Sequence, residues 1–243
     1  MELLKTVNMK IKLILSLFIL ITITGFAQTK VYLIPTLHSL HKINNNYSYD
    51  SLKSIINRIN PDIIAVEIRE SDISADTSYL KKNYPYEMWM MPRWFSSTKI
   101  EGFDWLGDDI EGNPIPQNYW KEISAIKKCE KALSIDSIYT ASISKCDSFA
   151  NARLEILKTF SLKEILESDD ATLCNKYYDC YSELLSGTDY ELIPQLNKKR
   201  NEKILFNINE LVKKYNGKII VIITGDDHYV YLKDKVKHIS IYY

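Results

Sequence analysis

The chain has no excess of charge of either sign, and it lacks the short motifs that identify several common enzyme classes. Its 243 residues include 31 basic and 31 acidic side chains. Attraction to nucleic acid needs a basic excess, so we expect no nucleic acid partner. The sequence has no G-x-S-x-G, H-E-x-x-H, G-x-G-x-x-G or P-loop pattern. It therefore shows none of the standard signatures for a nucleophilic serine, a helical zinc site or a bound nucleotide.

The first 27 residues predict a secretory signal peptide. Two lysines precede an apolar run from Ile11 to Ile23, and the small residue Ala27 closes the segment. A basic region, a short apolar core and a small residue at the cleavage position are the parts of such a peptide. We therefore expect a periplasmic or secreted protein whose mature chain begins near Gln28. The alternative is an uncleaved segment that anchors the protein in a membrane.

The sequence has only four cysteines, and all of them lie between Cys129 and Cys180. Export permits disulfides, and an even count allows two of them in three connectivities. No C-x-x-C pair is present, which disfavours a structural zinc site. Pairing sequence neighbours closes the shortest loops and predicts the disulfides Cys129–Cys146 and Cys174–Cys180. Buried free thiols are the alternative.

Apolar runs and helical patterns alternate at both ends of the chain. The runs Val31–Pro35 and Ile63–Val66 flank a helical pattern over Tyr49–Ile59. Near the other end, a helical pattern over residues 193–215 leads into the strongest strand, Ile219–Thr224. Strands that are apolar on both faces suit a parallel sheet, and two of them around a helix form a βαβ unit. A short helix and a last strand over residues 239–241 complete the pattern.

The middle of the chain predicts a helical insertion in a single domain that spans residues 28–243. The segment Tyr79–Phe95 is interrupted by prolines, which predicts a short helix and an irregular loop, and Ile100–Phe103 is a weak third strand. Residues from about 117 to 190 have helical periodicity and carry every cysteine. We therefore predict an α/β fold: a mostly parallel sheet with flanking helices, βαβ units at both ends and a central helical insertion.

Polar side chains follow the predicted strands at the points where the strands end. His38, Glu67, Asp104 and His228 each come directly after one of these apolar runs or within four residues of it. The carboxyl ends of parallel strands meet at one edge of a sheet, where ligands bind, so we expect these four side chains to converge. Imidazole can act as a general base or a metal ligand, and a buried carboxylate needs a partner. The pattern predicts an active site.

One arginine on the late helix is expected to face the same site. Arg200 lies on the apolar stripe of that helix, between Leu196 and Ile204. A guanidinium that points inward requires an anion, which Glu67 or a substrate carboxylate or carbonyl would supply. The alternative is that Arg200 extends past the edge of the core to solvent.

Further residues are candidates for substrate binding or for support of the site. His41 follows His38 by three residues and is expected to reach the same cleft. Arg69 is the nearest partner in sequence for a structural salt bridge with Glu67, which is the alternative to a catalytic role of that carboxylate. Asp104 and Asp227 are expected to orient a histidine or the substrate. His238 begins a strand and is interpreted as structural.

Four short motifs, in order along the chain, resemble those of the TraB/GumN superfamily, which includes the TIKI-type proteases and is related to ChaN-like and erythromycin-esterase-like proteins. They are Pro35-Thr36-Leu37-His38, Glu67 in Val66-Glu67-Ile68-Arg69, Arg200-Asn201 and Gly225-Asp226-Asp227-His228. The resemblance spans nearly all of the expected mature chain. It departs from the family at Pro35, where glycine is usual. It implies an α/β fold with a helical insertion and a hydrolytic site of two histidines, a glutamate and a supporting arginine.

The resemblance leaves the cofactor open. TIKI-like members are metal-dependent proteases, whereas erythromycin-esterase-like members use histidine and glutamate without a metal. We expect an exported hydrolase in which His38, Glu67 and His228 activate water, directly or through Mn, Co or Zn, to cleave an ester or peptide bond. Arg200 would stabilise the oxyanion or anchor Glu67. The alternatives are a haem-binding protein of ChaN-like type, with His38 and His41 near the iron, and a degenerate member that only docks a partner. The oligomeric state and the small-molecule or peptide substrate are not predicted.

Overall fold

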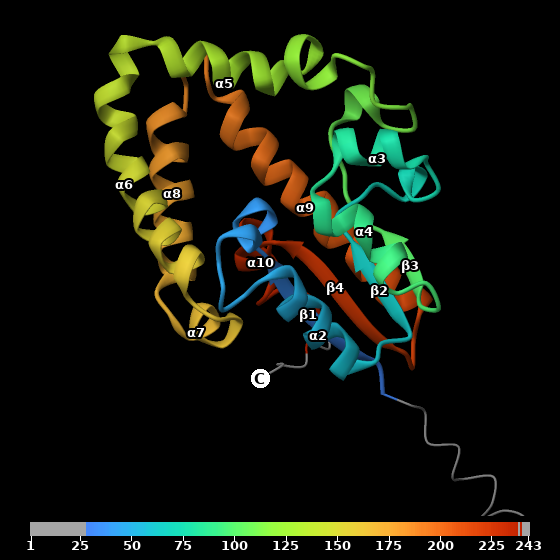
Figure 1. Ribbon diagram of the computed structural model, residues 1–243. Helices are drawn as coiled ribbons and strands as arrows, with labels where there is room; N and C mark the ends of the chain where they lie inside the picture. The colour runs from blue at the N-terminus through green and yellow to red at the C-terminus, as the bar shows by residue number, and fades with distance from the viewer. Residues whose placement is uncertain (1–27, 238, 240–243) are drawn as a thin grey trace, which may run out of the picture.

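A computed structural model of the protein describes residues 28–237 and residue 239. Four parallel strands form one sheet in the order β1-β4-β2-β3 (Figure 1). Helices flank this sheet, so the predicted α/β class is confirmed. The expected signal peptide, His238 and most of the predicted last strand lie outside the described residues, although Ile239 pairs in parallel with Val31. The strands are β1 (Lys30–Thr36), β2 (Ile63–Val66), β3 (Lys99–Gly102) and β4 (Ile219–Gly225).

The order of the strands corrects one prediction. The βαβ unit predicted from the first two apolar runs would place β2 beside β1 in its simplest form, but β4 lies between them. On one side Tyr32 of β1 is in register with Val221, and on the other Ile64 of β2 is in register with the same residue. β4 is the most continuous apolar run among the four strands, and a strand of that kind is favoured in the centre of a parallel sheet, buried on both faces. His38 and Glu67 therefore follow strands on either side of β4.

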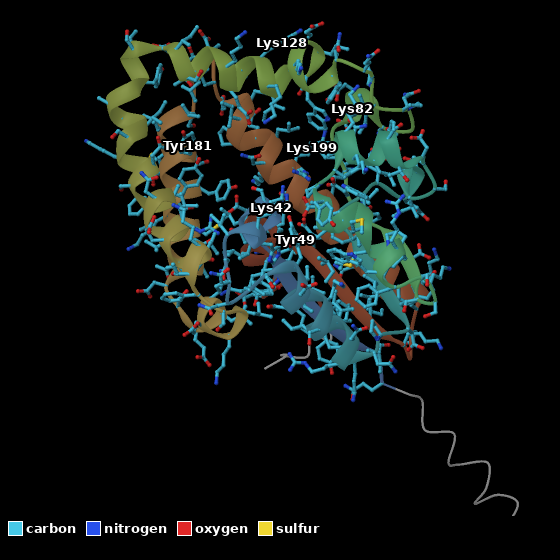
Figure 2. All side chains as sticks on the ribbon, in the orientation of Figure 1. Lys42, Tyr49, Lys82, Lys128, Tyr181 and Lys199 are labelled. Carbon is cyan, nitrogen blue, oxygen red and sulfur yellow. A yellow bond between two sulfur atoms is a disulfide. The ribbon has the colours of Figure 1, made fainter. Side chains whose placement is uncertain are left out.

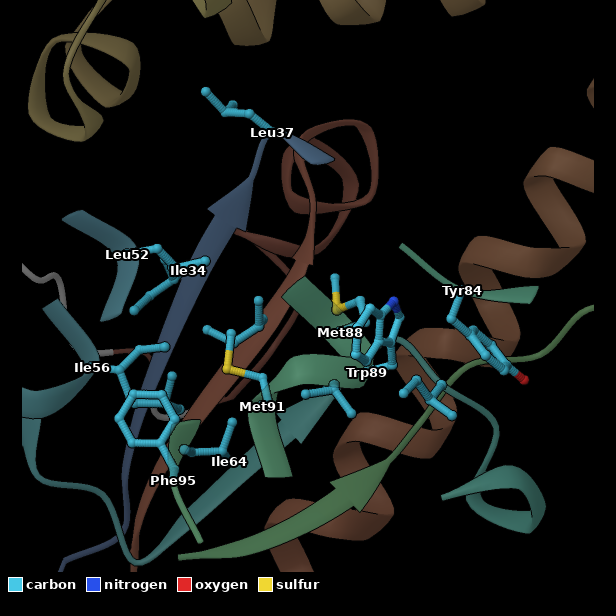
Figure 3. Packing of buried hydrophobic residues seen from close by; sticks show 14 of the residues in the cluster. Ile34, Leu37, Leu52, Ile56, Ile64, Tyr84, Met88, Trp89, Met91 and Phe95 are labelled. Carbon is cyan, nitrogen blue, oxygen red and sulfur yellow. The ribbon is translucent and has the colours of Figure 1, made fainter. Parts of the chain in front are cut away.

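Alternate residues of the strands feed two separate cores, one on each face of the sheet. Ile34, Ile64 and Val221 pack on one face against α2 and α4, as Figure 3 shows for part of this core. Val31 and Ile222 pack on the other face against α9 and α10. This alternation is what period-two side-chain geometry requires of a sheet covered on both faces. The covering helices are α2 (Tyr49–Ile59), α4 (Tyr86–Trp94), α9 (Leu192–Lys214) and α10 (Asp226–Leu232).

The segment Tyr79–Phe95 forms two helices, not the predicted helix and loop. α3 (Thr77–Asn83) ends before Pro85, and α4 begins directly after that proline. Pro92 lies in the last turn of α4, where a proline removes only one of the helical hydrogen bonds. The prolines therefore mark the boundary between two helices and do not prevent the second.

The predicted helical insertion is present. α6 and α8 lie side by side at the left of Figure 1, and α5 connects this pair to the region above α3. Short helical turns also follow strands β1 and β2 and occur in the segment after β3. In the described part of the chain, no helix is long and apolar enough to cross a membrane. The helices of the insertion are α5 (Ala125–Ile135), α6 (Ser137–Thr159), α7 (Leu162–Glu167) and α8 (Asp170–Leu185), and the short helical turns are η1 (His38–Lys42), η2 (Glu70–Asp72), η3 (Asp108–Ile110) and η4 (Tyr119–Ile123).

The disulfide pairing that we predicted is wrong. A single disulfide joins Cys146 on α6 to Cys180 on α8, with Cα atoms 5.5 Å apart, and Cys129 and Cys174 are free thiols. Cys174 and Cys180 lie on the same helix, where six residues span about 9 Å, beyond the range that a disulfide bridges. Sequence proximity is therefore a poor guide inside helices, and the bond forms between the two helices that lie side by side.

Candidate functional site

Glu67 is the centre of the site at the carboxyl edge of the sheet. It follows β2 directly and is only 5% exposed. Its Oε2 accepts hydrogen bonds from the backbone N–H of Gly225 at 2.8 Å and from the hydroxyl of Thr224 at 3.1 Å, both at the end of β4. Its Oε1 accepts one from Arg200 at 2.8 Å. Three donors from two elements thus hold the carboxylate in one orientation.

Arg200 joins Glu67 to the end of the third strand. Its Nε donates to Asp104 at 3.1 Å, and one terminal nitrogen contacts both Asp104 and Glu67. The inward orientation predicted from the helical stripe is confirmed. Asp104 also accepts from the N–H of Trp105 at 2.7 Å, and it acts on the site through Arg200. Burial raises the pKa of Asp104 to about 6, although the positive charge of Arg200 opposes the shift.

Burial alone would also raise the pKa of Glu67. The positive charges of His228, Arg200 and His38, together with the N–H of Gly225, outweigh that penalty and lower its pKa to about 2. Glu67 is therefore a carboxylate throughout the neutral pH range. A buried anion that is already bonded to donors can stabilise a positive charge that develops nearby.

His228, on the first turn of α10, approaches Glu67 from the other side. Its Nε2 lies 3.5 Å from Oε1 of Glu67, and its Nδ1 lies 2.6 Å from Oδ1 of Asn201. An amide oxygen only accepts, so Nδ1 carries the proton and Nε2 keeps its lone pair. Burial lowers the pKa of His228 to about 4 against the attraction of Glu67. The ring is therefore neutral near pH 7. Asn201 belongs to one of the sequence motifs, but we assigned it no role.

His38 has the opposite protonation state. Its Nδ1 lies 2.7 Å from Oε1 of Glu87, and the residue adopts a left-handed backbone conformation with φ of 50°. Burial would lower its pKa, but the hydrogen bond that it donates to Glu87 and the charges of Glu67 and Glu87 raise it to about 9. His38 is therefore a cation near pH 7. Pro35, where the sequence departs from the family pattern, lies within β1. His38 still lies at the carboxyl edge of the sheet.

Gly225 lies close to the side chains of both His38 and Glu67. A Cβ atom built at this position would lie 2.8 Å from Nε2 of His38 and 3.6 Å from Oε2 of Glu67. Any side chain here would displace the histidine ring. The absence of a side chain at the end of β4 thus leaves room for the ring of His38, which follows β1, on the side of Gly225 near the carboxylate of Glu67.

Glu87 is a site residue that the sequence reasoning missed. It lies on α4, is completely buried, and its Oε1 accepts from the hydroxyl of Thr36 at 2.8 Å as well as from His38. Its Oε2 has no hydrogen-bond partner among the described residues. Interaction with His38 and Thr36 lowers the pKa of Glu87 despite the cost of burial. A carboxylate inside an otherwise apolar, methionine-rich helix was the signal that would have identified it.

His41 does not reach the site as we expected. It is 2% exposed; its Nδ1 donates to the carbonyl of Tyr47 at 2.6 Å, and its Nε2 accepts from the N–H of Leu37 at 3.0 Å. Both ring nitrogens are therefore occupied by the turn that follows β1. His41 shapes the loop that carries His38 and has no free nitrogen for a substrate or for haem iron.

Arg69 also lies apart from Glu67. It donates to Asp72 at 2.9 Å and to the carbonyl of Ile110 at 2.6 Å. Arg69 begins the turn η2, which directs its side chain toward the loop after β3. The structural salt bridge considered for Glu67 and Arg69 is replaced by the pair of Glu67 and Arg200.

Asp227 faces the helical insertion. It accepts from the hydroxyl of Tyr178 at 2.7 Å and pairs with Arg153 on α6. Arg153, which is 5% exposed, also pairs with Asp170 at 3.0 Å and with Asp226 at 2.7 Å. The sequence reasoning missed Arg153, because its helix has no clear apolar face. This ionic cluster ties the segment that carries His228 to the insertion.

The donors around Glu67 do not fit a divalent metal. Among the residues that the structure describes, no three His, Cys, Asp or Glu side chains are grouped to hold a metal ion. Both oxygens of Glu67 already accept hydrogen bonds, and the guanidinium of Arg200 lies 2.8 Å from one of them. A dication at that oxygen would be repelled by the guanidinium. The metal ligands predicted from the sequence converge, but their environment suits a proton better than a metal.

The fold and the site define an α/β protein with two histidines and a glutamate at the carboxyl edge of a parallel sheet. No protein-family model matches this chain, and the comparisons with curated proteins and with solved structures give no match. The resemblance to the TraB/GumN superfamily therefore stays a prediction based on the four motifs. The function is therefore inferred from the geometry of the site itself.

Proposed function

We propose that the protein is a hydrolase that activates water with His228 and Glu67 and assists bond cleavage with His38. The observation that carries this proposal is the contact of Glu67 with His228, across Gly225 from His38. The pKa of His38 is raised and that of His228 is lowered, which is a basis for assigning one of them as the acid and the other as the base. The reaction class is attack of water on an ester or amide carbonyl.

His228 is the proposed base. Its unprotonated Nε2 accepts a proton from the attacking water, and Nδ1 keeps its hydrogen bond to Asn201. The imidazolium that forms is stabilised by the carboxylate of Glu67, whose Oε1 lies 3.5 Å away. Arg200 holds that carboxylate in place. Of the two roles expected for Arg200, its contacts with Glu67 and Asp104 favour the anchor over the oxyanion donor.

His38 is the proposed acid. One ring proton is donated to Glu87, and the second, on Nε2, is on the side of the ring that faces Gly225 and Glu67. This N–H would stabilise the oxyanion and then protonate the leaving group, so a cationic His38 is the active form. Glu87 is a positioning residue that keeps His38 charged and oriented.

The proposed chemistry uses side chains only, in line with the poor fit of the site to a metal. A haem-binding role is less well supported, because His41 has no free nitrogen. The N-terminal sequence still predicts export, so the proposed hydrolase would act in the periplasm or outside the cell.

The test is a screen of the purified mature chain against nitrophenyl esters and fluorogenic peptides. We expect turnover that survives treatment with a chelator within about twofold and falls on the order of 100-fold in His228→Ala. Activity that disappears with the chelator and returns with Mn, Co or Zn would contradict the metal-free mechanism. Turnover that is unaffected by His228→Ala would overturn the proposed site.

A further inference from the structure

A cavity of about 750 Å³ lies between the helices of the insertion and α9. Its lining includes three tyrosines of α8, Asp147 of α6 and Asn197 of α9. Figure 2 shows one of these tyrosines, Tyr181, on α8. The volume is within the range of cavities that bind small molecules. The tyrosines are Tyr177, Tyr178 and Tyr181.

The cavity adjoins the proposed catalytic residues. Tyr178 lines it and donates through its hydroxyl to Asp227, the neighbour of His228. On the opposite wall, Asn197 lies one helical turn before Arg200 and Asn201, on the same face of α9. His38, Glu67 and His228 are not part of the lining. A molecule in the cavity would therefore have to extend past Tyr178 to reach the residues that activate water.

The walls combine aromatic rings with negative charge. The ring of Tyr177 lies 4.9 Å from that of Tyr181 and 5.2 Å from that of Tyr178, measured between centroids. The carboxylate of Asp147 lies 3.5 Å from the hydroxyl of Tyr181. Within the described chain, the lining includes Glu130 but no lysine or arginine. Aromatic faces and a carboxylate without a basic residue beside them in the wall attract a cation.

The disulfide fixes the spacing of these groups. Cys146 immediately precedes Asp147, and Cys180 immediately precedes Tyr181. The covalent bond therefore holds the carboxylate of α6 and the aromatic ring of α8 at a set separation. A wall that is fixed before binding loses little conformational entropy when a ligand enters.

We infer that this cavity binds an organic cation, an ammonium or guanidinium group, that forms part of the substrate. The inference rests on the proposed function only in calling the bound molecule a substrate. The cation would lie against Tyr177 and Tyr181 with its charge near Asp147. The bond to be cleaved would then extend past Tyr178 toward His228.

The first test measures binding by calorimetry on the full mature chain carrying His228→Ala, so that turnover plays no part. Choline is compared with its neutral carbon isostere dimethylbutanol, and N-acetylarginine amide with the neutral N-acetylcitrulline amide. We expect at least one cation to bind about tenfold more tightly than its neutral partner. The pair that shows the difference identifies the cation as an ammonium or a guanidinium. Equal affinities within both pairs would overturn the inference.

A matched pair of variants locates the binding. Asp147→Asn keeps the shape of the cavity and removes its charge, and it should weaken cation binding about tenfold. Glu183→Gln makes the same change in charge on α8 outside the lining, and it should leave the affinity within about twofold. Circular dichroism checks that both variants are folded. Equal effects of the two variants would show that the cation binds elsewhere.

The second test connects the cavity with hydrolysis. Nitrophenyl esters of a trimethylammonium acid and of its neutral isostere are compared in the wild type and Asp147→Asn. The variant should lose about tenfold in kcat/KM for the cationic ester alone. If neither ester is hydrolysed while the cation binds, the proposed function fails and the cation site stands. If both esters lose activity equally, the cation is not part of the substrate.

Discussion

The carboxyl edge of the sheet and the helical insertion are held together in different ways. At the sheet edge, Glu67 is bonded to the backbone of the neighbouring strand β4, which packs between two large apolar cores. The insertion has a small apolar cluster around Leu185. Its helices α6 and α8 are connected by one disulfide and by the ion pairs of Arg153. Changes to the catalytic residues at the edge should therefore affect activity, and changes to the bonds that connect the helices of the insertion should affect stability.

Removal of Arg153 should have the largest effect on stability. Arg153→Met would leave the buried Asp170 and the partly buried Asp226 without their cation, which we expect to lower the free energy of unfolding by about 3–5 kcal/mol. The same change at Lys198, which is exposed on α9, should have little effect. Urea unfolding of the two variants measures the difference. Equal stability would show that the ionic cluster does not hold the insertion.

Removal of the proposed base should affect activity and leave stability nearly unchanged. His228→Ala should lower kcat/KM on the order of 100-fold or more, because no other group in contact with Glu67 can take the proton from water. Its melting temperature should stay close to that of the wild type. A clear loss of stability with activity retained would assign a structural role to His228 and would contradict the difference between the two regions.

Loss of the disulfide should loosen the insertion and not the sheet. Cys146→Ser, Cys180→Ser and the double variant should each lower the free energy of unfolding by about 2–4 kcal/mol, since the bond closes a segment with a sequence separation of 34. Hydrogen exchange should rise in α6 and α8 while β4 stays protected. Cys129→Ser, at a free thiol, is the control. Faster exchange in β4 would show that the two regions unfold together.

The pH dependence of the rate separates the two histidines. Activity should rise as pH increases through about 4, where His228 loses its proton, and fall as pH increases through about 9, where His38 does. Because its pKa is raised in the folded state, protonated His38 stabilises the protein below its unfolded pKa of 6.5. This contribution is lost as pH rises through about 9.

Glu87→Gln should shift the upper limb of the pH profile to lower pH, because it removes the anion that raises the pKa of His38. Glu183→Gln, which is exposed on α8, should not change that limb. An unchanged upper limb in Glu87→Gln would mean that another group controls the loss of activity at high pH.

The difference between the sheet edge and the helical insertion also explains what could be predicted from the sequence. His38, Glu67 and His228 follow apolar runs, and the geometry of a parallel sheet brings such residues to one edge whatever the order of the strands. The convergence was therefore predictable even though the position of β4 was not. The order was missed because strands that follow one another in the sequence are usually neighbours in a sheet, whereas here β4 lies between β1 and β2.

Partners in the helices were harder to predict. Cys146, Cys180 and Arg153 meet their distant partners only when α6 packs on α8, and the weak periodicity of α6 does not show which of its faces makes that contact. Glu87 was missed because its partner, His38, lies 49 residues away in the chain. The inward orientation of Arg200 was predictable because its helix has a clear apolar stripe.

The most direct test of a site shared by His38, Glu67 and His228 is a titration of the histidine side chains by NMR in the wild type and in Glu67→Gln. We predict that His38 is protonated and His228 is neutral at pH 7, with pKa values of about 9 and about 4. Replacement of Glu67 should lower both, because its negative charge raises the pKa of each ring. Two histidines that titrate near their ordinary value, unaffected by Glu67→Gln, would contradict a shared site.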